Sequence, residues 1–178
     1  NTWFSNVGGS PRVIVAVPTA VDLDIDTASG DVSLTGVNGR LVVRTASGRA
    51  EIDSVGGDIR VHTASGDIAL EDAAGTIDLK SSSGEIELSA CRGALTLDTA
   101  SGDITGETLE VTADLRAESS SGDIVLDLRN PLRDLSYEFS SASGSLRFGD
   151  TRGRDSMSGG SGRFRVVART ASGSIEVF

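Results

Sequence analysis

Carboxylates are the side chains in this sequence whose number and spacing could support chemistry. Paired carboxylates in a cleft can act as general acid and base, and a row of them can bind a cation or a cationic ligand. Acidic residues recur in the segments that follow Ser-Gly pairs: Glu51, Asp53, Glu71, Glu87, Glu107 and Asp127. Because these residues are spread evenly along the chain, we expect an acidic binding face rather than a catalytic site, and no enzyme activity.

A second column, which directly follows the glycines of the Ser-Gly pairs, contains several aspartates that could hold calcium. The column consists of Asp31, Arg49, Asp67, Glu85, Asp103 and Asp123. Calcium-binding nonapeptide repeats combine Asp with paired glycines, but within the regular repeats a double glycine occurs only at Gly56-Gly57. Since Arg49 also interrupts the column, we predict no metal site and no cofactor.

The sequence has one Cys and one His. Cys91 occupies a position that holds Ala or Val in other repeats, which predicts a buried small side chain rather than a nucleophile. A single cysteine cannot form an intramolecular disulfide. His62 follows the apolar Val61, so we expect it to point outward, in a row with Arg44 and Lys80.

An internal repeat sets the elements that position these residues. The motif T-A-S-G occurs at 27–30, 45–48, 63–66 and 99–102, and S-S-S-G replaces it at 81–84. The glycines of these motifs are therefore 18 residues apart. A second series of glycines, Gly39, Gly57, Gly75 and Gly93, divides each unit in half. Such a regular period is the signature of a repeat architecture.

Apolar residues recur at i and i+2 between the glycines, as at Ile68 and Leu70 and at Ile77 and Leu79. This is the period of a half-buried strand, so each unit contains two strands and two turns. A single-layer antiparallel meander would fit the spacing but would leave its apolar face uncovered, whereas a solenoid packs two parallel sheets against each other. Because parallel crossovers are right-handed, we predict an all-β, single-domain, right-handed parallel β-solenoid with about 18 residues and two strands per coil.

Domain boundaries follow from where this register begins and where it loosens. We expect residues 1–22 to form an N-terminal strand and cap, with Trp3 and Phe4 over the first coil, and residues 23–178 to form the solenoid. Insertions interrupt the register near 106–114 and 129–136, and a loop is expected at 149–163. In solenoids such insertions lie beside the coil.

Charge is unevenly distributed along the chain. Residues 1–128 contain 8 basic and 21 acidic side chains, and residues 129–178 contain 8 basic and 5 acidic ones. We expect the final strand, residues 174–178, to be an open sheet edge without a cap. An acidic end and a basic end predict weak end-to-end self-association that salt screens.

The overall composition limits the partners. The net charge of −10 argues against nucleic acid. The sequence contains no run of 18 apolar residues. The acidity of one sheet costs stability through like-charge repulsion, so it serves either to prevent face-to-face association or to receive a cationic ligand.

The steps S-G-D-I, S-G-E-I and S-G-S-I, preceded by T-A-S-G, occur from Ser29 to Ile175. Over roughly residues 20–178 this pattern resembles a bacterial adhesin-like β-strand-repeat domain family of unknown function. The resemblance implies a β-helical module outside the cell or at the bacterial cell surface, with any anchor in a segment not present here. We therefore expect a non-catalytic envelope module, adhesin-like or scaffold, whose partner is an unknown protein or glycan. The alternative is a cation- or glycan-binding module that uses the acidic face.

Overall fold

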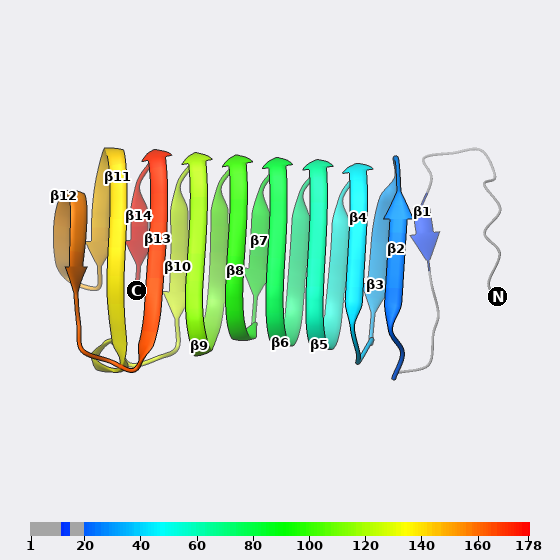
Figure 1. Cartoon of the computed structure of the whole chain (residues 1–178), viewed down its shortest axis with the longest axis horizontal. Coiled ribbons are helices and arrows are strands. Elements are labelled where there is room, and N and C mark those ends of the chain that lie inside the picture. The colour runs from blue at the N-terminus through cyan, green and yellow to red at the C-terminus, as the bar shows by residue number, and fades with distance from the viewer. Residues whose placement is uncertain (1–11, 15–19) are drawn as a thin grey trace.

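The chain forms a β-solenoid of about six turns with about 18 residues per turn. The computed structural model describes residues 12–14 and 20–178 (Figure 1). The strands are β1 (Arg12–Ile14), β2 (Leu23–Thr27), β3 (Asp31–Thr35), β4 (Leu41–Ser47), β5 (Ala50–Ser65), β6 (Ile68–Ser83), β7 (Ile86–Ser89), β8 (Arg92–Ser101), β9 (Ile104–Ser121), β10 (Ile124–Leu128), β11 (Leu135–Phe148), β12 (Thr151–Gly159), β13 (Phe164–Ser172) and β14 (Ile175–Val177). The expected lid of Trp3 and Phe4 lies outside the described residues.

Two parallel sheets face each other across the core. In Figure 1 the front sheet contains β2, β4, β8 and β13, and the rear sheet contains β3, β7, β10 and β14. The long strands β5, β6, β9 and β11 turn a corner and contribute to both sheets. Front strands run upward and rear strands downward while the chain advances from right to left, so the coil is right-handed, as predicted.

The parallel register excludes the meander. Ile68 lies opposite Ile86 in neighbouring parallel strands, one coil apart in the same sheet. The predicted core columns are confirmed: Ile68, Leu70, Ile77 and Leu79 are at most 2% exposed. Because each inward residue stacks on its counterpart in the next coil, the columns form one continuous apolar core.

Backbone packing explains the glycine at the Ser-Gly corner and at the opposite side of each coil. Gly75 has a φ of 140°, and a Cβ there would collide with the carbonyl oxygen of Gly57 in the preceding coil. Hydroxyl groups near the Ser-Gly corner donate to the carbonyl oxygens of these stacked glycines, as from Ser81 to Gly66 at 3.3 Å and from Thr99 to Gly84 at 3.2 Å. From Ser81 onward the hydroxyls of this column therefore link neighbouring coils, whereas Thr45 donates to Ser47 of its own coil at 3.1 Å.

The insertion near 106–114 stays within strand β9 rather than forming a loop. Gly93 pairs with Val111 and Leu95 with Leu115, so the extra residues bulge out between these two pairs. The next insertion forms an arch that contains a short 3-10 helix, Leu132–Asp134. The side chain of Asn130 secures this arch, since its Oδ1 accepts from the Val111 amide at 2.7 Å and its Nδ2 donates to the Val111 carbonyl at 2.9 Å.

The order of the last coils in space differs from their order in the chain. Strand β13 lies between β9 and β11, and β14 lies between β10 and β11, with parallel pairing on both sides. The chain therefore passes over one coil position after β10, builds β11 and β12, and returns to fill the position with residues 164–178 (Figure 1). The expectation that residues 174–178 form an open edge is wrong, because β14 has a neighbour on each side.

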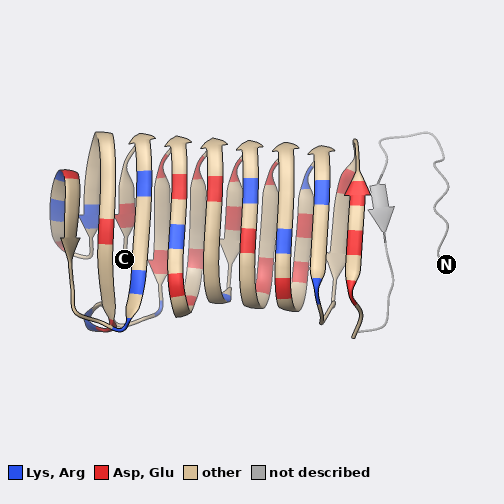
Figure 2. Cartoon of the chain, in the orientation of Figure 1, with Lys and Arg blue, Asp and Glu red and all other residues tan. Residues whose placement is uncertain are grey.

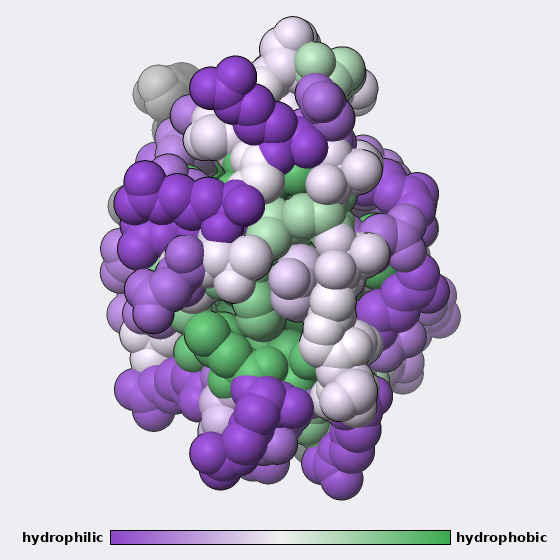
Figure 3. Space-filling view, turned by 90° about the vertical axis from the view of Figure 1, so that its left-hand side faces the viewer, coloured by the Kyte–Doolittle hydropathy of each residue, from purple (hydrophilic) through white to green (hydrophobic). Residues whose placement is uncertain are grey.

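The described end of the solenoid is instead the antiparallel hairpin of β11 and β12. Most of the segment that we expected to be a loop at 149–163 is strand β12, because its residues pair with β11 from Tyr137 to Phe148. Met157 packs partly buried against the core at this end, beside a stacked pair of Tyr137 and Phe148 with ring centroids 4.2 Å apart. Figure 3 shows that apolar surface remains visible on this end face between hydrophilic side chains.

Candidate functional site

The six predicted acidic residues lie on the outer face of the rear sheet. Each alternates with a buried residue, and all are exposed or half-buried. In one row Glu51, Ala69 and Glu87 occupy successive coils, and in the next row Asp53 and Glu71 lie side by side. Glu107 lies opposite Ser89 in that second row, and Asp127 follows beside the register shift between β9 and β10.

Arg49 partly neutralises this face, which the sequence analysis did not anticipate. Its guanidinium contacts Glu87 at 2.9 Å and Glu51 at 3.4 Å, and so bridges carboxylates two coils apart. The signal was present in the sequence, because Arg49 replaces an acidic residue in the column beside the sheet. Within the described part of the chain no ion pair involves Glu71 or Glu107. The same is true of Asp53 and Asp127, so four of the six carboxylates on this face have no ion pair among the described residues.

A shallow depression of about 320 Å³ lies on the acidic face. Its lining includes Glu71, Glu87 and Glu107 together with Arg49 and the hydroxyl-bearing Ser89 and Thr105. Among the residues that the structure describes, no three His, Cys, Asp or Glu side chains lie close enough to hold a metal ion. The depression can offer carboxylates and hydroxyls to a cationic or polar partner, but it has no chelating geometry.

Aspartates that follow the Ser-Gly glycines have a structural task. The carboxylate of Asp31 accepts a hydrogen bond from the backbone amide of Arg49 at 3.0 Å, and Asp67 accepts from Glu85 at 3.1 Å. Asp123 accepts in the same way from Ser174 at 2.6 Å. Because these amides lie in the turns, the carboxylates satisfy donors that the sheets leave unpaired. The pKa of Glu85 is raised, first by partial burial, then by the nearby Glu87 of the sheet face, and then by its column neighbours Asp103 and Asp67.

The front sheet carries a mixed charge pattern. Arg44, His62 and Lys80 occupy one row on successive coils, and His62 is exposed, as predicted. The guanidinium of Arg44 contacts Asp24 at 2.8 Å and Asp26 at 3.3 Å. In Figure 2 blue segments (Lys and Arg) and red segments (Asp and Glu) are interspersed along the strands of this sheet. The front face therefore compensates much of its charge internally, in contrast to Glu71 and Glu107 on the rear.

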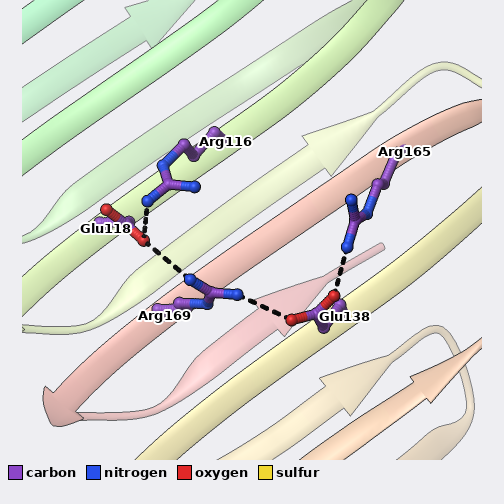
Figure 4. A network of polar contacts seen from close by, with 5 residues as sticks. All are labelled: Arg116, Glu118, Glu138, Arg165 and Arg169. Carbon is purple, nitrogen blue, oxygen red and sulfur yellow. Dashed lines mark hydrogen bonds and ion pairs between the residues drawn. The ribbon is translucent and has the colours of Figure 1, made fainter.

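A chain of ion pairs crosses three strands of the front sheet where the C-terminal coil is inserted (Figure 4). On β9, Arg116 contacts Glu118 at 2.6 Å, and Glu118 contacts Arg169 of β13 at 3.7 Å. Arg169 also contacts Glu138 of β11 at 2.8 Å, and Arg165 of β13 pairs with the same carboxylate. The sequence did not reveal this network, because its members come from strands that are neighbours only through the unexpected coil order.

Replacing Glu138 by glutamine is expected to change the acid branch of the stability curve. Hydrogen bonds from Arg169 and Arg165 hold the pKa of Glu138 below its ordinary value. A lowered pKa in the folded state adds stability that is present above the unfolded pKa of about 4.3 and is lost as the pH falls through the folded pKa. The melting temperatures of E138Q and the unchanged chain should therefore differ most near neutral pH and converge in acid. Glu107→Gln is the matched control, and an equal pH profile for both variants would contradict the prediction.

Cys91 has the environment of an inert core residue. It is 1% exposed, and burial raises the pKa of its thiol to about 11. Its Sγ lies 3.3 Å from the carbonyl oxygen of Ser89. Since the thiolate is the nucleophilic form of cysteine, this thiol is unsuited to covalent chemistry at neutral pH. The prediction of a buried small side chain is confirmed.

The architecture defines a β-solenoid whose outer faces are built from repeated rungs. The described residues include no helix with the length and hydropathy of a membrane span. A family model matches residues 2–178, and the chain belongs to this family, Toastrack DUF4097. The family is uncharacterised, and the match does not extend the resemblance to an adhesin activity. No curated protein and no solved structure matches the chain.

Proposed function

We propose that this chain is a non-catalytic module of the bacterial cell envelope that acts as a scaffold or adhesin-like surface. The observation that carries the proposal is the acidic outer face of the rear sheet, where Asp53, Glu71, Glu107 and Asp127 have no ion pair in the described part of the chain. Asp53 and Glu71 lie directly opposite each other on neighbouring rungs, and such like-charge pairs cost stability that a solenoid without a partner for this face would not need to lose. A cationic surface of a protein or glycan partner outside the cell would offset this cost.

The test is retention of the labelled, purified chain on isolated bacterial envelopes at physiological salt. We expect Glu71→Gln combined with Glu107→Gln to lower retention several-fold, because the double variant removes the two carboxylates in the depression that have no ion pair. The matched control is Asp58→Asn combined with Asp98→Asn, which removes the same number of charges from exposed positions elsewhere and should leave retention unchanged. Equal retention of both double variants would contradict the role of the acidic face.

The second candidate is a cation- or glycan-binding module, and the depression on the acidic face favours it. The same retention assay separates the two functions. A scaffold that contacts its partner directly should be retained equally with millimolar calcium and with a chelator. A module that uses calcium should lose retention in the chelator, and calcium should raise its melting temperature through binding linkage. Charge reversal at Asp53 and Glu71 should abolish that increment.

A further inference from the structure

Residues 164–178 form a coil that lies between two coils built from earlier parts of the sequence. We call the space that this coil fills the slot. One wall of the slot is formed by β9 and β10, and the other by β11. The coil reaches the slot through residues 160–163, which link β12 to β13 and of which Ser161 and Arg163 are exposed. The regular inner coils differ, because each of them continues directly into the coil that lies next to it along the solenoid axis. The coil of β13 and β14 can therefore leave its position while the coils from β2 to β10 stay intact.

The slot recognises the coil through contacts made on both walls. Thr170 donates to the carbonyl oxygen of Gly122 at 3.1 Å, and on the other wall Ser141 donates to the carbonyl oxygen of Gly173 at 2.8 Å. Arg169 pairs with Glu118 on the first wall and with Glu138 on the second. None of these contacts depends on the linker. The same coil from another molecule would make all of them.

We propose that this slot accepts residues 164–178 of a second copy of the chain, so that two copies exchange their C-terminal coils reciprocally. Exchange of an identical element is a low-cost route to a two-fold dimer, because it preserves every contact of the monomer. In dilute solution the tethered coil has the higher effective concentration and keeps the monomer closed. The exchanged dimer should become populated when the coil no longer fits the slot of its own chain, or when the linker is too short to reach that slot.

A charge-exchange pair tests this proposal with the full chain. One variant carries Glu118→Lys and Glu138→Lys, which makes both slot walls basic against its own arginines. The other carries Arg165→Glu and Arg169→Glu, which makes its coil acidic against its own acidic walls. Each variant alone has a mismatched slot, whereas a reciprocal heterodimer has two matched slots. After joint heating and slow cooling, we expect light scattering to show a species of about twice the monomer mass.

The control pair reverses an ion pair of the same sheet that cannot be exchanged. Arg44→Glu in one chain and Asp24→Lys with Asp26→Lys in the other alter β2 and β4, which belong to the continuous coils. This mixture should remain monomeric. Two folded charge-exchange variants, verified by circular dichroism, that stay monomeric after joint cooling would overturn the proposal.

A linker deletion provides a second test that leaves residues 164–178 and both walls of the slot unchanged. The linker connects strands on opposite sides of β11, which are two strand spacings or about 9.6 Å apart. Deleting residues 160–162 leaves two Cα–Cα steps between Gly159 and Phe164, which span at most about 7.6 Å. The shortened chain should therefore form dimers, and a chain with three added Gly or Ser residues at this site should stay monomeric. A shortened chain that is a monomer with unchanged melting temperature would overturn the proposal.

Discussion

Truncating Ile77 to alanine is expected to lower the free energy of unfolding by about 2–5 kcal/mol. Ile77 is 0% exposed and lies between Ile59 and Leu95 of the neighbouring coils. Because both neighbours are held by parallel ladders, the site cannot collapse around the missing atoms, and a cavity remains. Urea denaturation followed by circular dichroism measures the loss.

Leu132→Ala is the control for this truncation. Leu132 is 37% exposed in the arch after β10, so its replacement should change stability by less than about 0.5 kcal/mol. An equally small effect of I77A would mean that the inner columns are not packed as the structure describes.

Gly75→Ala is expected to be the other strongly destabilising substitution. The residue has a φ of 140°, and the new Cβ would collide with the carbonyl oxygen of Gly57. Backbone strain alone costs about 1–3 kcal/mol, and relief of the collision would separate two coils in the middle of the array. The melting temperature and the urea midpoint should both fall clearly.

Gly36 provides a matched glycine at another corner. It has a φ of 75°, and a Cβ there would meet nothing within 4 Å. The same corner position is occupied by Ser54, Asp72 and Ala90 in the next three coils, and Ala90 has a φ of 52°. This conformation therefore accepts alanine within the same fold. Gly36→Ala should therefore cost no more than about 1–2 kcal/mol. Similar losses for G36A and G75A would show that the stacked carbonyl of Gly57 is not what requires glycine.

The regular part of the fold was predictable because local periodicity determines it. Apolar residues at i and i+2, as at Ile68 and Leu70, specify which side of each strand is buried, and the glycine spacing specifies where each coil turns. The order of the last coils was not predictable in this way. Residues 164–178 carry the same T-A-S-G and alternating pattern as the other coils, and this pattern fits any position in the array, so it does not say which coils are neighbours.

The candidate acidic face was predictable as a set of outward positions but not in its electrostatics. Strand alternation alone placed Glu71 and Glu107 outside. The compensation of Glu51 and Glu87 by Arg49 depends on a long side chain that leaves its own column and crosses to the sheet. The segment 151–159 was misjudged for a related reason. Its Gly, Ser and Arg residues lack an apolar alternation, and it forms β12 because β11 offers an antiparallel partner.

The glycine ladder has a consequence for how such a molecule can change in length during evolution. Every coil from β4 to β9 packs on its neighbours through the same stacked glycines, and stability in such arrays is a sum over adjacent units. An in-frame duplication of one unit would lengthen the solenoid by one rung, about 4.8 Å. The coils on either side would still pack against the same kind of glycine-stacked surface. The hairpin of β11 and β12 and the inserted coil of β13 and β14 would be displaced together along the axis with their contacts unchanged. The length of the solenoid can therefore vary while the structure of this end stays the same.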